Sequence, residues 1–304
     1  MKRFVIHIAL LCLVCTVCLA PPLYYYEYLA RQNTTMEPFC SINRVYSYSH
    51  DDADLIVMGN SRSMHYNTAI LDSLLGLKCR NIGWAGHPFD FQYHGMFKTY
   101  MRYNKPPKYI LQEITPQLFF SSDDTGFVLE MLPNIDKPEF QFYIDLCPNL
   151  SYADKFLLVR YAGKMEQVIK QIGELKEEKS VDFCSVFHPW QFEGKRPVEK
   201  DPQIISLFQH YLDECDSLGI RVVLLCSPFR EEDAKKYLDM NAFWNQIDTI
   251  TKGRDVNILN YQSYFGSDTT YFFDPAHLKP MAVAAYTRKV AHDLDSLCII
   301  PHKK

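Results

Sequence analysis

Five short apolar runs, separated by segments with helical periodicity, restrict the fold of this 304-residue chain more than any other feature. Their continuous apolar character is typical of strands that are buried on both faces. Segments with apolar stripes at helical spacing lie between them. The alternation predicts an α/β fold, a three-layer, doubly wound sheet of five mainly parallel strands. The expected strands cover residues 54–59, 79–83, 108–114, 220–226 and 256–260, and the expected helices cover residues 67–75, 89–103, 202–218, 234–250 and 280–297.

One connection is much longer than the others. Roughly residues 115–200 separate the third strand from the fourth, and they are rich in aromatic side chains, with a charged helical stretch at 164–179. Connections of this length inside a doubly wound domain are usually functional insertions. We therefore expect one domain over residues 31–304 that contains this insertion. Within the insertion, His188, Trp190 and Phe192 would form either a sugar-stacking wall or an ordinary aromatic mini-core.

The first thirty residues predict a membrane segment. Lys2 and Arg3 precede an apolar run over residues 4–20, which prolines and a cluster of tyrosines follow. A signal peptide cleaved after Ala20 is one interpretation, but Pro21 would then follow the cut, where signal peptidases tolerate it poorly. We favour an uncleaved anchor over residues 1–30, with the tyrosines at the membrane interface. Because basic residues stay in the cytoplasm, the rest of the chain would be exported to the periplasmic or extracellular face.

Charge and composition exclude several classes of protein. Lys and Arg number 32 against 36 Asp and Glu, a net charge of −4 with no basic stripe, which argues against nucleic-acid binding. With 12 Gly and 17 Pro, the chain is not of low complexity. The cysteines beyond the first thirty residues are scattered and no Cys/His cluster has zinc spacing. No metal or organic cofactor is implied.

Three short segments carry residue types that could do chemistry, and each has two interpretations. Ser61, in Gly59-Asn60-Ser61, follows the first strand, where open α/β sheets bind ligands; it could equally cap a helix. The glycines of Asn81-Ile-Gly-Trp-Ala-Gly86 could turn backbone N–H groups toward a cavity, or simply form a tight turn. In Asp274-Pro-Ala-His277, the carboxylate could orient the imidazole so that its other nitrogen takes a proton from a serine. A plain turn with a surface histidine is the alternative.

Taken in order along the chain, these segments make the sequence similar to the SGNH/GDSL esterase-lipase superfamily, over roughly residues 54–114 and 220–296. The resemblance implies a flavodoxin-like SGNH fold with a catalytic serine. It would make Ser61 the nucleophile, His277 the base and Asp274 the residue that orients His277. Gly86 would donate a backbone N–H to the oxyanion hole together with Ser61. The anchored layout most resembles branches that act on cell-surface polymers, including the D-alanyl transfer proteins of teichoic acid and the acetylation proteins of exopolysaccharides.

The sequence departs from the family pattern at two places. Asn60 stands where the family's GDS motif has Asp. The GxND block, whose asparagine donates to the oxyanion hole, is not found, and the third strand instead runs into Glu113-Ile-Thr-Pro116. Loss of one such donor costs on the order of 10²–10³ in turnover. Arg62 and His65, beside the serine, and Arg230, after the fourth strand, are speculative substrate contacts.

The resemblance implies an exported serine esterase or acyltransferase that acts on acyl groups, acetyl foremost, of a cell-surface carbohydrate through an acyl-enzyme on Ser61. Its partners would be the glycan substrate and a membrane-bound acyltransferase. The alternative is a non-catalytic SGNH-like surface protein that binds glycan or such an acyltransferase, which the two departures favour. A flavodoxin-like nucleotide or phosphate binder is disfavoured, because the chain has no glycine-rich phosphate loop.

Overall fold

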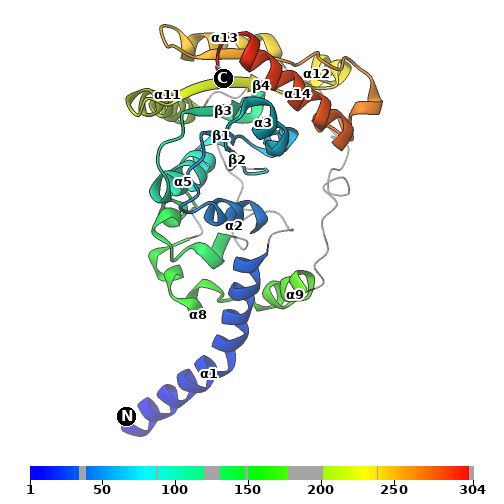
Figure 1. The fold of residues 1–304 in the computed structure, drawn as a ribbon. Coiled ribbons are helices and arrows are strands. Elements are labelled where there is room, and N and C mark those ends of the chain that lie inside the picture. The colour runs from blue at the N-terminus through cyan, green and yellow to red at the C-terminus, as the bar shows by residue number, and fades with distance from the viewer. Residues whose placement is uncertain are drawn as a thin grey trace. The chain divides into compact units, whose positions relative to one another are not determined.

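A computed structural model describes residues 1–33, 39–86, 88–119, 131–147, 150–176, 201–237 and 239–300 (Figure 1). The chain divides into two compact units. Unit 1 is formed by Met1–Asn43 and Asp123–Val181, and unit 2 by Arg44–Ser122 and Asp182–Lys304. In this division the N-terminal helix belongs to the same unit as Asp123–Val181.

Unit 2 contains the sheet, and the prediction of five parallel strands is confirmed. The strand order is β2-β1-β3-β4-β5, and every neighbouring pair is parallel. This is the flavodoxin-like order of a doubly wound sheet, in which the chain reverses direction across the sheet between β1 and β3. Ligands bind such sheets outside the carboxyl ends of the strands at that point. The strands are β1 (Leu55–Met58), β2 (Cys79–Asn81), β3 (Tyr109–Glu113), β4 (Arg221–Cys226) and β5 (Asn257–Asn260).

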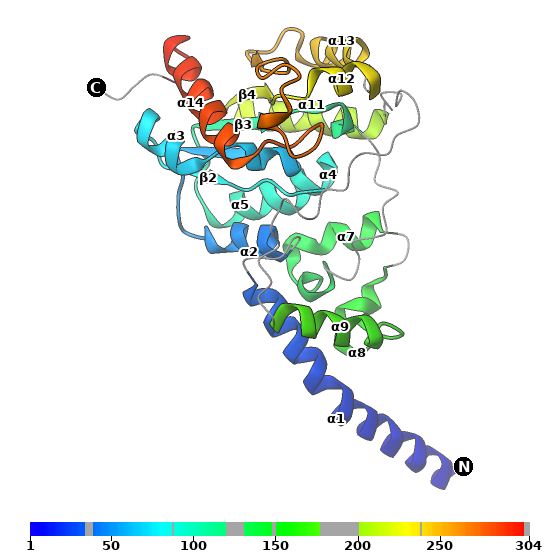
Figure 2. The same cartoon turned by 90° about the vertical axis from the view of Figure 1, so that its right-hand side faces the viewer.

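Helices cover both faces of the sheet (Figures 1 and 2). On one face, α3 (Thr68–Leu75) packs against α14 (Pro280–Ser296), and both bury apolar side chains on the sheet. Because side chains alternate along a strand, Leu55 and Val57 point to this face and Met58 to the other. There the hydroxyl of Tyr211, in α11 (Pro202–Ser217), lies 3.8 Å from the Met58 sulfur.

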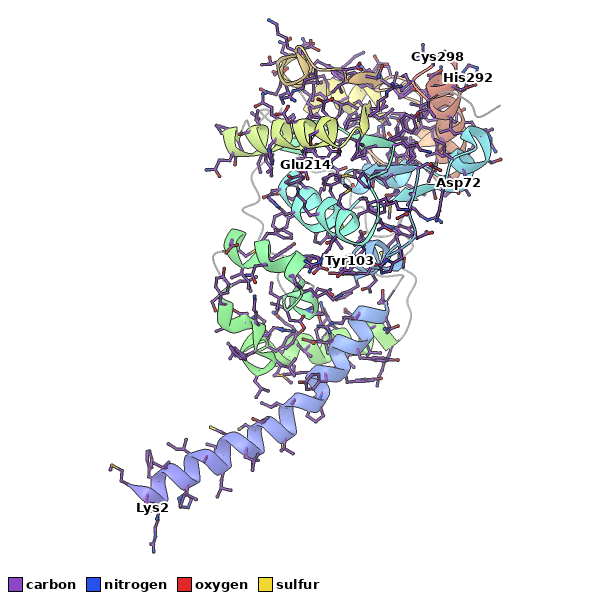
Figure 3. The ribbon with its side chains drawn as sticks, turned by 60° about the vertical axis from the view of Figure 1, so that its left-hand side comes forward. Lys2, Asp72, Tyr103, Glu214, His292 and Cys298 are labelled. Atoms are coloured by element: carbon purple, nitrogen blue, oxygen red, sulfur yellow. The ribbon has the colours of Figure 1, made fainter. Side chains whose placement is uncertain are left out.

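On the second face, the covering helices are held to one another by aromatic side chains and an ion pair. The Phe89 and Phe208 rings meet edge to face, with centroids 4.7 Å apart. Glu214 of α11, labelled in Figure 3, accepts from the Tyr93 hydroxyl and pairs with Lys98, both at 2.5 Å. These contacts link α11 to one helical segment built from α4 (Phe89–Phe91), a π-helical turn η2 (Gln92–Phe97) and α5 (Lys98–Tyr103).

The expected helix over residues 234–250 is instead two helices, α12 (Glu231–Tyr237) and α13 (Met240–Thr251). Asp239 begins the second, because its carboxylate accepts from the Ala242 N–H at 3.0 Å. An apolar stripe runs through both helices and does not reveal this break. Unit 2 also contains the short 3₁₀ helices η1 (Ser61–His65), η3 (Pro116–Phe119) and η8 (Thr269–Tyr271). Helix α2 (Phe39–Ser47) crosses the boundary between the units.

Unit 1 is built around α1 (Lys2–Gln32), which runs on through Pro21 and Pro22. Its most apolar 18-residue window has a mean hydropathy of 2.5, so the helix is long and apolar enough to cross a membrane. Among its neighbours in the described part of the chain are η5 (Leu132–Asn134), α8 (Leu157–Arg160) and α9 (Met165–Lys176), which pack against it. The elements beyond α1 are η5 (Leu132–Asn134), η6 (Pro138–Phe140), α7 (Gln141–Leu146), η7 (Tyr152–Lys155), α8 (Leu157–Arg160) and α9 (Met165–Lys176).

The two halves of α1 have different surroundings. Residues 1–19 are exposed throughout, whereas Leu23, Tyr26, Glu27 and Ala30 are buried within unit 1. Tyr26 therefore does not join the expected interfacial belt: its hydroxyl donates to Gln171 of α9. The neighbouring Tyr24, Tyr25 and Tyr28 are exposed.

Candidate active site

Three side chains from distant parts of the sequence meet beside the carboxyl end of β1. The Oγ atom of Ser61 lies 2.8 Å from Nε2 of His277. Nδ1 of the same ring lies 2.7 Å and 2.9 Å from the two carboxylate oxygens of Asp274. With Nδ1 donating to the carboxylate, Nε2 is left as the acceptor for the serine hydroxyl. This is the relation of a nucleophile, a base and an orienting acid.

The loop that carries Asp274 and His277 is held by its own hydrogen bonds. One Asp274 oxygen accepts from the N–H groups of Ala276 and His277 at 2.8 and 2.9 Å, and Phe273 N–H donates to the His277 carbonyl at 2.9 Å. Burial acts to raise the pKa of Asp274, but these bonds and the contact with the imidazole outweigh it. The pKa therefore lies below the ordinary value for an aspartate. Asp274 is ionised at neutral pH, as an orienting carboxylate must be.

Ser61 is the first residue of the 3₁₀ helix η1, which Gly59 and Asn60 connect to the end of β1. Its capping residue is Asn60, whose side-chain oxygen accepts from the Arg62 N–H at 3.1 Å. An Asp at this position would supply the same acceptor. The amide group of Asn60 adds a donor, and it bonds Thr115 Oγ1 at 3.2 Å, beyond the end of β3. The substitution of Asn for Asp thus preserves the cap and ties the turn to the neighbouring strand.

Two glycines are required where the loops after β1 and β2 approach this turn. A Cβ on Gly59, whose φ is +150°, would lie 2.5 Å from the Glu113 Cβ. A Cβ on Gly83 would lie 1.8 Å from Ser63 Oγ. Asn81 bridges the two loops, because its amide donates to the Ser63 carbonyl at 2.8 Å and its oxygen accepts from Gly83 N–H at 2.9 Å. The second loop is therefore packed directly on η1.

Gly86 lies at the exposed end of the same loop, with a φ of +76°. In this left-handed conformation a side chain would be strained. Trp84 N–H anchors the start of the segment on the Gly59 carbonyl at 2.8 Å. The next residue, His87, lies outside the described residues.

Arg62 is buried, with 3% of its side chain exposed, and is surrounded by protein groups. Its guanidinium lies over the Phe229 ring at 3.6 Å and donates to the Ser227 carbonyl. Its Nε lies 3.5 Å from the carboxylate of Glu113, whose side chain is fully buried. These surroundings leave Arg62 little surface for a substrate.

Glu113 is the centre of a buried polar cluster. Its carboxylate accepts from the Tyr66 hydroxyl at 2.6 Å, and from the N–H and hydroxyl of Ser227 at 3.0 and 2.5 Å. Tyr66 also contacts the Tyr286 hydroxyl at 2.9 Å. Burial raises the pKa of Glu113, while Arg62 and these donors act in the opposite direction. Glu113 is the last residue of β3, so this end of the strand holds a buried, hydrogen-bonded carboxylate.

His65 is the last residue of η1 and connects it to the loop that carries His277. Its ring is buried, and Nε2 accepts from the Leu278 N–H, next to His277, at 3.1 Å. Burial, together with the nearby positive charge of Arg62, lowers the pKa of His65 well below its ordinary value. A neutral His65 joins the two segments that must meet for Ser61 to reach His277, and it is covered from substrate.

Arg230, the third speculative contact, lies near the same loop. Its N–H donates to the Pro275 carbonyl at 2.8 Å, and its partly exposed side chain pairs with Asp233. Of the three candidates, it alone retains appreciable exposure, 28% of its side chain. His188, Trp190 and Phe192 lie outside the described residues. Within the described ranges, no group of three or more His, Cys, Asp or Glu residues could hold a metal ion.

No model of a protein family matches this chain, and no curated protein matches it significantly. The geometry of the site is therefore the evidence for function. Sequence reasoning had singled out Ser61, Asp274 and His277, which the fold brings together. It missed the roles of Glu113, Tyr66 and Ser227. The available signal was a carboxylate at the end of an apolar strand, since a buried charge needs partners.

Proposed function

We propose that this protein is a serine esterase or acyltransferase that forms an acyl-enzyme on Ser61. The observation that carries the proposal is the continuous line of hydrogen bonds from Ser61 through His277 to Asp274. Ser61 Oγ would attack an ester carbonyl while His277 Nε2 takes the hydroxyl proton. The tetrahedral intermediate then breaks its bond to the leaving oxygen, which receives that proton from His277. Water or a sugar hydroxyl reverses these steps and releases the acyl group.

The oxyanion of this reaction would be stabilised by the backbone N–H groups of Ser61 and Gly86. The left-handed backbone at Gly86 and the packing of its loop on η1 support that assignment. Neither Arg62 nor His65 takes a direct part, because both are buried among protein groups. They act as positioning residues for η1 and for the loop of the base. Arg230 remains the candidate for contact with substrate.

A cell-surface carbohydrate ester is the substrate class that we favour, with acetyl as the first acyl group to test. This choice follows from the resemblance to SGNH/GDSL proteins and from α1, which is long and apolar enough to anchor the chain in a membrane. In an exported orientation the site would face polymers outside the cell. A membrane-bound acyltransferase would be a suitable partner for passing the acyl group to such a polymer.

A fluorophosphonate probe tests the activated serine directly. The full-length protein, in detergent or nanodiscs, is treated with the probe, and the adduct is located by peptide mass spectrometry. We expect labelling at Ser61 that is lost in Ser61→Ala and in His277→Ala. The control Ser217→Ala removes an exposed hydroxyl on α11 and should label as the wild type does. Absence of labelling in the wild type would refute the activated serine and favour a protein that only binds glycan or an acyltransferase.

A further inference from the structure

Exposed large apolar side chains are concentrated on unit 1. Beyond the exposed N-terminal stretch of α1, the described part of unit 1 carries seven of them and the much larger unit 2 carries six. A soluble surface tolerates such side chains singly, but a concentration of them marks an interaction site. Those of unit 1 are Tyr24, Tyr25 and Tyr28 on α1, Tyr152, Phe156 and Val159 along η7 and α8, and Ile169 on α9.

The length of α1 determines where these side chains would lie if the helix crosses a bilayer. The apolar run begins at Phe4, and a helix rises about 1.5 Å per residue, so Tyr24 lies about 30 Å along the axis. That distance equals the thickness of the hydrocarbon core, and the headgroup layer adds about 5–7 Å beyond it. The stretch from Tyr24 to Tyr28 therefore falls in the headgroup layer. Exposed tyrosines are typical of this layer.

Contacts within unit 1 place α8 and the end of α9 at the level of Tyr24–Tyr28 along the axis of α1. Lys176 at the end of α9 has its Nζ 5.1 Å from the Tyr25 ring centroid. Glu27, about 4.5 Å beyond Tyr24 along the axis, accepts from Arg160 of α8 at 2.5 Å and from the Tyr161 hydroxyl at 3.0 Å. Figures 1 and 2 both show α8 and α9 beside the C-terminal half of α1.

We propose that the surface formed by η7, α8 and α9 docks on the headgroup layer of a phospholipid bilayer, around the point where α1 leaves it. Phe156, Val159 and Ile169 would insert shallowly, while Tyr152 and Lys155 would stay with the headgroups. Lys155 Nζ lies 5.4 Å from the Tyr152 ring centroid, so both side chains would lie at the same depth, and Lys170 pairs with Glu174 at 3.7 Å. The proposal depends on α1 crossing the membrane and not on the reaction at Ser61.

Photo-crosslinking in a bilayer tests this surface with the full-length protein. Benzoylphenylalanine replaces Phe156 in one variant and Ile169 in another, and each is reconstituted into phosphatidylcholine nanodiscs. The control carries it at Leu297, an exposed apolar residue at the end of α14 in unit 2. All three positions are more than half exposed, so the label should not disturb folding. Adducts are identified by mass spectrometry after irradiation.

We expect lipid adducts at residues 156 and 169 in at least tenfold excess over residue 297. Each other outcome would overturn the proposal. Adducts to peptides of unit 2 would mean that this face is covered by the rest of the chain, and crosslinked dimers would mean a second copy. Equal lipid labelling at Leu297, or none at any site, would mean that unit 1 makes no specific contact with the bilayer. Ser61 labelling by the fluorophosphonate probe is independent of all these results.

Discussion

Removing the charge of Glu113 should destabilise unit 2 strongly, although Glu113 does not touch the reacting atoms. The substitution Glu113→Gln keeps the size of the side chain. It leaves the Arg62 guanidinium buried without its carboxylate, 3.5 Å away in the native protein. Breaking a buried ion pair by removing one partner costs about 3–5 kcal/mol.

Hydrogen bonding points in the same direction. The carboxylate accepts from Tyr66 and twice from Ser227, and all these donors are buried. A glutamine has one acceptor oxygen, and its amide would face donors, so at least one donor is left unpaired at a cost of about 1–3 kcal/mol. The two costs share the same site and are not additive. We expect the free energy of unfolding to fall by about 3–5 kcal/mol.

Urea unfolding followed by tryptophan fluorescence measures this change, because Trp84 and Trp244 lie in unit 2. Arg62→Met and the double variant complete a thermodynamic cycle. Since the double variant removes both charges, it should be more stable than the sum of the single effects predicts, by about 2 kcal/mol or more. Asp52→Asn is the matched control. Asp52 pairs with Lys105 at an exposed site, so no measurable change is expected.

Two results would contradict this reasoning. A loss of less than about 1 kcal/mol in Glu113→Gln would show that the carboxylate is not ionised against Arg62, or that water reaches the cluster. Strict additivity in the cycle would show that the two side chains do not act as a pair. Either result would show that the buried ion pair does not stabilise η1.

Three further predictions concern the site. Asp274→Asn should slow fluorophosphonate labelling about 10⁴-fold, the cost of this change to turnover in serine proteases, while circular dichroism shows the fold intact; near-normal labelling would refute the orienting role. Gly83→Ala should lower the free energy of unfolding by about 1–3 kcal/mol, and with it the melting temperature, because the new Cβ would meet Ser63. Gly173→Ala is the control and should change neither, because nothing lies within 4 Å of its Cβ. His65 stays neutral when folded and protonates when unfolded, so stability should fall below about pH 6.5, by up to about 1.4 kcal/mol per pH unit. His65→Gln should flatten that dependence in urea unfolding at pH 7.5 and 5.5, and an unchanged slope would assign it to another group.

Local patterns were sufficient for much of the architecture. Buried parallel strands appear in a sequence as continuous apolar runs. The ends of each expected strand lie within two residues of the ends of the observed one. The pairing of Ser61 with Asp274 and His277 could also be expected, because the carboxyl ends of parallel strands converge at one edge. The Asp-x-x-His spacing itself brings the carboxylate to the ring, and the structure shows this contact at 2.7 Å.

What the sequence by itself determined is thus the alternation of strands and helices, the apolar N-terminal helix and the residue types of the site. Only the tertiary structure decided that Arg62 and His65 are buried, that Glu113 pairs with Arg62, and that the second half of α1 packs on helices from the insertion. The physical reason is that charge and polarity can be read from one residue. Burial and pairing depend on distant residues. Ser227, which contacts Arg62, and Leu278, which contacts His65, each lie more than 150 positions further along the chain and are brought near only by the fold.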